Sequence, residues 1–93
     1  MSDPFTDLAN FSHDGNYTPD KTIELLSLYL GREPKKEEKY KMLLISSLVS
    51  IMWYSWAVFK MTVEVQDRTK FKEYRDQYLE YALIMNDASK RYF

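Results

Sequence analysis

Two tryptophans, Trp53 and Trp56, lie three residues apart in an apolar stretch of the chain. On a helix this spacing places them about one turn apart on one face, where both rings can contact the same ligand. The face of an aromatic ring attracts a desolvated cation by roughly 0.5–2 kcal/mol. The pair therefore indicates either a site for an organic cation or packing in a hydrophobic core, which is the commoner role of such pairs.

A second group of aromatic residues follows at helical spacing. Phe71 and Tyr74 are placed to close the other side of a cation site that the tryptophans begin. The residues that continue this face, Tyr78, Tyr81 and Met85, are expected to pack in the core. Aromatic residues make up 16% of the chain, a high share for a simple helical bundle, so some rings are expected to bind a ligand.

The sequence lacks the motifs that most catalysts need. Its two glycines, Gly15 and Gly31, are too far apart to form a phosphate-binding loop. His13 is the only histidine and the chain has no cysteine, so a zinc site or a Ser/His/Asp triad is not expected. We expect this chain alone to catalyse no reaction.

Charge and hydropathy limit the partners. A net charge of −1 gives no reason to expect nucleic acid. The stretch from Met42 to Phe59 has no formal charge and is just long enough to span a membrane. Its four serines, and the dense charge on both sides, favour the central helix of a soluble domain, with a membrane-anchored protein as the alternative. The start of the chain carries no secretory signal, and the lack of cysteine fits a cytoplasmic protein.

The elements that would position these residues are helices. Asp3-Pro4 and Thr18-Pro19 are helix-start signals, and Gly31 suits a helix C-cap. His13 to Asn16 read as a turn. The segment from Arg32 to Lys41 reads as a solvated loop and a first helical turn. The sequence predicts one all-α domain over residues 1–93, with about four helices at 4–12, 19–30, 35–64 and 68–91.

Two segments resemble the choline/ethanolamine kinase family. The stretch Ser2-Asp3-Pro4-Phe5-Thr6-Asp7-Leu8-Ala9-Asn10-Phe11 is similar to the segment that follows that family's metal-binding I-D-W-E-Y-A-G motif. The stretch Ile51-Met52-Trp53-Tyr54-Ser55-Trp56, followed by Phe71-Lys72-Glu73-Tyr74, is similar to its tryptophan pair and C-terminal aromatic residues. The first motif is shared with aminoglycoside phosphotransferases, and the combination is more specific.

The resemblance implies a fold and a site. The chain would be equivalent to the C-terminal helical part of a protein kinase-like fold, in which aromatic rings wall the choline pocket. Trp53, Trp56, Tyr74 and Phe71 would form that wall, and Asp14, seven residues after Asp7, would supply a carboxylate near the ammonium. Asp14 also suits an ordinary turn before Gly15. The substrate would be choline or a related amino alcohol, and a tryptophan cage suits choline better than ethanolamine.

The resemblance begins after the family's catalytic and metal-binding aspartates. We therefore expect the chain to be the C-terminal part of a longer kinase, whose upstream lobe would bind ATP and Mg²⁺. Surface that such a lobe covers would be exposed and would favour homo-oligomers. The alternative is a stand-alone helical interaction module, with an aromatic groove for a partner helix.

Overall fold

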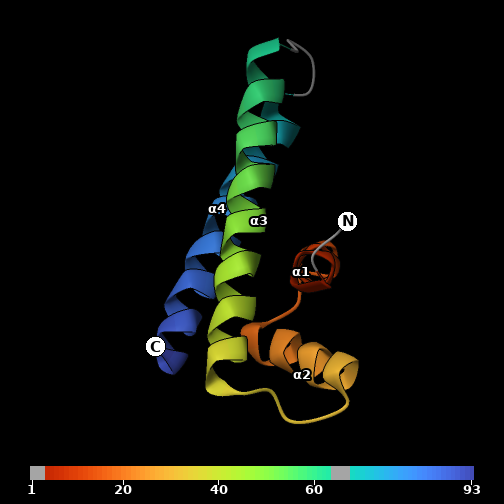
Figure 1. Ribbon diagram of the computed structural model, residues 1–93. Helices are drawn as coiled ribbons and strands as arrows, with labels where there is room; N and C mark the ends of the chain where they lie inside the picture. Colours follow the sequence, from red (N-terminus) through yellow and green to blue (C-terminus); the bar gives the residue numbers. More distant parts are fainter. Residues whose placement is uncertain (1–3, 64–67) are drawn as a thin grey trace.

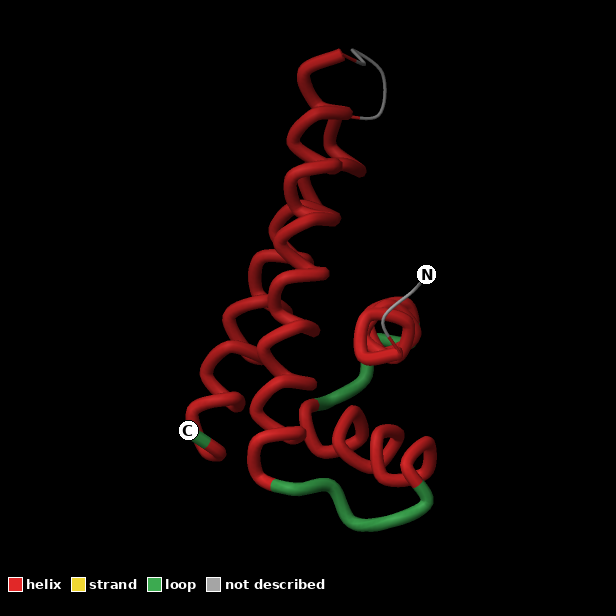
Figure 2. Tube along the Cα trace, in the orientation of Figure 1, coloured by secondary structure: helices red, strands yellow, loops and turns green. Residues whose placement is uncertain are grey.

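The computed structural model describes residues 4–63 and 68–93, and in these ranges it contains helices and no strands. The helices are α1 (Pro4–Asp14), α2 (Pro19–Leu30), α3 (Lys36–Val63) and α4 (Arg68–Ser89), followed by a short 3-10 helix, η1 (Lys90–Tyr92). Figure 1 shows α3 and α4 side by side and antiparallel, with α1 and α2 beside the first half of α3. Figure 2 shows the same helical path with its short connecting loops. The predicted all-α fold class is confirmed.

α2 has the bounds that its capping residues predict. The Thr18 side chain accepts a hydrogen bond from the Lys21 backbone N–H at 3.2 Å, and Pro19 occupies the first turn. At the other end Gly31 has a φ of 70° and its N–H donates to the Ser27 carbonyl. This left-handed conformation costs glycine little, so Gly31 ends the helix.

Two predicted helix ends were wrong. α1 continues through Asp14, so His13 and Asp14 lie in its last turn and not in a loop. Gly15 N–H still donates to the Phe11 carbonyl at 3.0 Å, and Asn16, with a φ of 53°, makes the turn. α4 ends at Ser89, where a 3-10 turn replaces the helix predicted to residue 91. Asp3, part of the predicted helix-start signal, and residue 64, the predicted end of the third helix, lie outside the described residues.

The core lies where the four helices meet, and it consists of two clusters that share Ile23 of α2. One cluster joins α1, α2 and α3, and the other joins α3 to α4. Tyr81 and Met85 belong to the second cluster, as the sequence predicted. The buried residues of the two clusters are Ala9, Leu26, Met42 and Val49, and Leu43, Tyr81, Met85 and Ala88.

The face of α3 that contacts the other helices is rich in small residues. Ser46, Ser47 and Ser50 are buried, and Ser47 Oγ donates to the Ala82 carbonyl of α4 at 2.9 Å. Small side chains let helix backbones approach closely, and each buried hydroxyl still needs a partner. The outward face of α3 carries larger apolar side chains that remain exposed, Leu48, Ile51, Met52 and Phe59.

α3 is long and apolar enough to cross a membrane by length and composition. Within its most apolar 18-residue window, 39% of the residues are buried against the rest of the molecule. A single helix of this kind is weak support for a membrane span, because the central helix of a soluble domain has the same properties.

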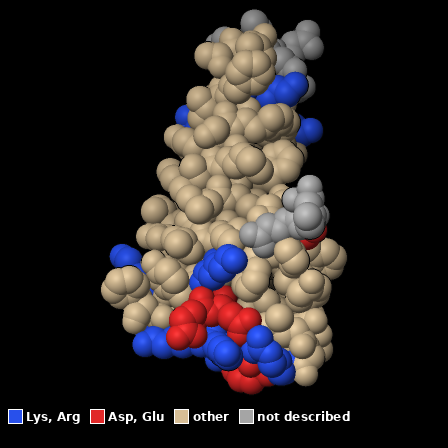
Figure 3. Space-filling model, in the orientation of Figure 1, with Lys and Arg blue, Asp and Glu red and all other residues tan. Residues whose placement is uncertain are grey.

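Charged residues gather at the base of the molecule, around the loop between α2 and α3 (Figure 3). Arg32 pairs with Glu38 at 2.8 Å and Lys39 with Glu33 at 2.7 Å. Glu38 also accepts the Lys35 backbone N–H at 2.8 Å, which caps the start of α3. The hydrogen bond from Arg32, followed by that from Lys35, lowers the pKa of Glu38 to about 2.

Candidate functional site

His13 lies where α1, α3 and α4 meet. It occupies the last turn of α1, and its Nδ1 is 3.1 Å from the hydroxyl oxygen of Ser50 on α3. Its ring stacks on Trp53 of α3, with centroids 5.9 Å apart and planes at 5°. On the α4 side it contacts Tyr78 at 4.8 Å and meets Tyr81 edge-on at 5.6 Å. The imidazole thus contacts two aromatic helix faces at once.

From His13 a closed series of neighbouring rings passes along α3 and returns along α4. We call this series the ring circuit. Its centroid separations are 5.9 Å for His13–Trp53, 5.7 Å for Trp53–Trp56, 5.7 Å for Trp56–Phe71, 6.3 Å for Phe71–Tyr74, 6.0 Å for Tyr74–Tyr78 and 4.8 Å for Tyr78–His13. Separations of this size are those of interacting aromatic pairs, so each ring restrains the next.

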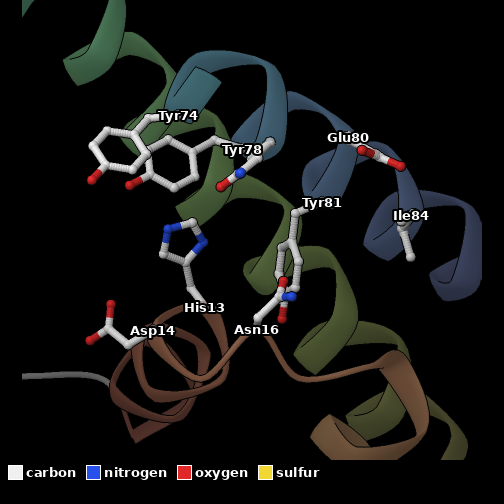
Figure 4. A pocket seen from close by; sticks show the side chains of 9 residues that line it. His13, Asp14, Asn16, Tyr74, Tyr78, Glu80, Tyr81 and Ile84 are labelled. Carbon is white, nitrogen blue, oxygen red and sulfur yellow. The ribbon is translucent and has the colours of Figure 1, made fainter. Parts of the chain in front are cut away.

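A pocket of about 590 Å³ opens beside the ring circuit, between the end of α1 and α4. Figure 4 shows Tyr74 and Tyr78 on one side, with His13 and Asp14 facing them from α1. The carboxylate of Asp14 points toward the space below Tyr74. The lining residues are His13, Asp14, Asn16, Tyr74, Gln77, Tyr78, Glu80, Tyr81 and Ile84.

The lining carries negative charge. Asp14 and Glu80 contribute two carboxylates, and no lysine or arginine is among the described residues that line the pocket. Burial, followed by the neighbouring Tyr74 and Asp14, raises the pKa of Tyr78. The negative charge of Asp14 is therefore close enough to the aromatic wall of the pocket to disfavour ionisation of Tyr78. Carboxylates beside aromatic faces favour a cationic ligand.

Burial sets the protonation of the pocket's other titratable rings. It lowers the pKa of His13 from 6.5, against the opposing effect of Asp14, so the neutral imidazole predominates at pH 7. Burial also raises the pKa of Tyr81 to about 12. The Tyr81 hydroxyl lies 2.9 Å from the Tyr17 carbonyl and 3.2 Å from the Ser12 carbonyl, and it donates its proton to them. This phenol ties the end of α1 to α4.

The predicted site residues divide into two groups. Asp14 and Tyr74 line the pocket. Trp53, Trp56 and Phe71 are not among its lining residues and form the other half of the ring circuit. Trp53 is half-buried against the core, and its Nε1 is buried without a hydrogen-bond partner.

Several residues that line the pocket were not predicted as site residues. Tyr78 was predicted in the core, yet it lines the pocket together with the buried Tyr81. The helical spacing of Tyr74, Tyr78 and Tyr81 was visible in the sequence, but spacing does not tell a pocket wall from a core. No pattern in the sequence marks Asn16, Gln77 or Glu80 as a pocket residue, because their position in the pocket depends on how α1 docks on α4.

Within the described ranges, no group of three or more His, Asp or Glu residues is arranged to hold a metal ion. The site is a pocket lined by aromatic rings, the carboxylates of Asp14 and Glu80, and a neutral histidine. No protein-family model matches the chain, and no curated protein or solved structure is significantly similar to it.

Proposed function

We propose that this chain is the choline-binding portion of an ATP-dependent choline kinase, an enzyme that makes phosphocholine. The observation that supports the proposal most directly is the pocket, in which Tyr74 and Tyr78 face Asp14 and no lysine or arginine lines the described surface. A quaternary ammonium has no N–H group to donate. Its recognition depends on aromatic faces and on nearby negative charge, and this pocket has both.

The proposed ligand pose follows from these contacts. The trimethylammonium group would lie between the Tyr74–Tyr78 pair and the Asp14 carboxylate. Each well-placed ring contributes roughly 0.5–2 kcal/mol to binding such a cation. Trp53 and Trp56 would hold these rings in place through His13 and Phe71, which completes the aromatic wall implied by the family resemblance.

The phosphate-transfer machinery would belong to an upstream lobe of the same enzyme. ATP, Mg²⁺ and the aspartate that orients the choline hydroxyl would be bound there, so this chain alone would bind choline without phosphorylating it. The exposed apolar residues on the outward face of α3, including Leu48 and Met52, are suited to contact that lobe. Without the lobe, the same face would favour association of two copies.

The same apolar face favours a second candidate, a helical interaction module. Leu48, Ile51, Met52 and Phe59 follow one another along α3 at spacings suited to a partner helix. This candidate predicts that a partner helix binds the chain and that choline does not.

Calorimetric titration of the chain with choline tests the proposal. Choline should bind, and its neutral carbon isostere, with a tert-butyl group in place of trimethylammonium, should bind at least about tenfold more weakly because it lacks the charge. Asp14→Asn should weaken choline binding by about tenfold while leaving helical circular dichroism unchanged. Asp87 has an exposed carboxylate on α4 outside the pocket, so Asp87→Asn is the matched control. This variant should bind choline as the unmodified chain does.

Equal affinity for choline and the neutral isostere would contradict a cation site. No binding of choline by the folded chain would overturn the proposed function and favour the interaction module. Equal losses in Asp14→Asn and Asp87→Asn would show that net charge, and not the pocket, attracts the ligand.

A further inference from the structure

His13 is the one basic side chain among the described residues that line the pocket, and it is the only histidine of the protein. It sits behind the space that Asp14 and Tyr74 border (Figure 4). Its ring is packed on Trp53, Tyr78 and Tyr81, and is therefore fixed on several sides. Whether this ring carries a proton decides whether the pocket already contains a positive charge.

The groups that face His13 differ between the three helices. On α1 the neighbouring carboxylate is Asp14, which favours the charged imidazole. On α3 the contacts are Ser50 and Trp53, and neither carries a charge. On α4 the titratable groups are the phenols of Tyr74, Tyr78 and Tyr81 and the carboxylate of Glu80. Lys70 lies one turn before Tyr74 on α4, with its Nζ 5.8 Å from the centroid of the Tyr74 ring, and it is not a lining residue.

The contact with Ser50 positions the ring in either charge state. In the neutral tautomer that carries its proton on Nε2, Nδ1 accepts the Ser50 hydroxyl proton at 3.1 Å, and a protonated Nδ1 donates to the Ser50 oxygen instead. Burial among the uncharged rings of Trp53, Tyr78 and Tyr81 disfavours the charged imidazole and lowers the pKa of His13.

We propose that His13 determines when the pocket accepts a cation: the neutral imidazole forms part of an aromatic wall that binds a quaternary ammonium, and the imidazolium repels it. This inference rests on the proposed function, because it concerns the same pocket. Ligand and proton then compete for one site. By linkage, ligand binding lowers the pKa of His13, and protonation of His13 weakens binding.

The first test follows the single imidazole by NMR while the pH of the 93-residue chain is titrated, with and without saturating choline. The inference predicts that choline lowers the pKa of His13. It also predicts that the Kd for choline rises between about pH 7.5 and about pH 5.5, by less than about tenfold because the pKa of His13 lies below 6.5. Carboxylates ordinarily titrate near pH 4, so a change in this interval reports the imidazole.

The second test uses His13→Gln, whose amide is neutral at every pH and can still hydrogen-bond Ser50. After circular dichroism has shown that it folds, its Kd for choline should not change over the same interval, whatever its absolute value. An unchanged or raised pKa of His13 in the presence of bound choline would overturn the inference and leave the proposed function standing. The same holds for a pH-dependent Kd that persists in His13→Gln. No choline binding at any pH would remove the proposed function and this inference with it.

Discussion

The two faces of α3 differ in the size of the side chains along the middle of the helix. The face that contacts α1 and α4 carries Ser46, Ser47 and Ser50, all buried, whereas the outward face carries Leu48 and Met52, each 57% exposed. The inner face is selected for small size, because it lies between two helices. The outer face has the apolar character of a surface that another surface covers. Since Met42, Leu43 and Val49 are also buried, apolar side chains occur on both faces of α3, and hydrophobicity alone does not identify the buried face.

Replacing one leucine on each face of α3 should show the largest difference between the two faces. Leu43 is fully buried between α3 and α4, and Leu48 is exposed. Leu43→Ala should lower the free energy of unfolding by about 3 kcal/mol, because it leaves a cavity as well as losing burial. Leu48→Ala should change the free energy of unfolding by less than about 0.5 kcal/mol. Urea unfolding followed by circular dichroism measures both.

Comparable losses in the two variants would mean that Leu48 is covered in solution, most simply by a second copy. Sedimentation velocity of the unmodified chain would then show a dimer, which would dissociate in Leu48→Ser.

A change of serine to valine tests whether the inner face of α3 needs a small side chain and its hydroxyl hydrogen bond. Ser47→Val adds volume between α3 and α4 and removes the hydroxyl that donates to the Ala82 carbonyl, so we expect a loss of about 2 kcal/mol. Ser55 is the matched control, since its hydroxyl bonds its own helix at the Ile51 carbonyl and the residue is exposed. Ser55→Val should be close to neutral in the same unfolding experiment. A neutral Ser47→Val would mean that α3 and α4 pack less closely than the structure has them.

On the inner face of α3, Ser50 contacts the imidazole of His13. The titration of His13 should give the smallest change in the free energy of unfolding. Burial lowers the pKa of His13 in the folded chain, so the unfolded chain, with an ordinary pKa near 6.5, binds the proton first as the pH falls. Stability should therefore decline as the pH drops below about 6.5 and level off below the folded pKa. The difference in unfolding free energy between the unmodified chain and His13→Gln, measured across this interval, isolates the contribution of His13. A difference that does not vary with pH would contradict the burial of the imidazole.

Local signals in the sequence predicted most of the fold. Thr18 with Pro19, and Gly31, determined both ends of α2, because capping depends on a few adjacent residues. The end of α1 was missed since Gly15 and Asn16 form the turn only after His13 and Asp14 have continued the helix. The burial of Tyr81 and Met85 was predicted from helical spacing and is confirmed.

The site was less predictable than the helices. Asp14 and Tyr74 were named as site residues and line one pocket, although α1 and α4 are far apart in the sequence. The separation of Trp53 from that pocket, and the presence of Glu80 in it, depend on how the helices rotate against one another. The buried serines of α3 lie at this contact between helices, and the spacing of residues along the sequence does not predict how two helices pack there.

The hydroxyl of Tyr81 has a consequence for the order of assembly. It reaches carbonyls 69 and 64 residues away in the chain, at Ser12 and Tyr17, and so closes two long loops. Contacts that close long loops form late, after a hairpin such as α3–α4 has reduced the distance to be searched. The pocket between α1 and α4 therefore exists only in the completely assembled chain. Any molecule that occupies it draws the folding equilibrium toward that state, which makes ligand occupancy and completion of folding a single coupled equilibrium.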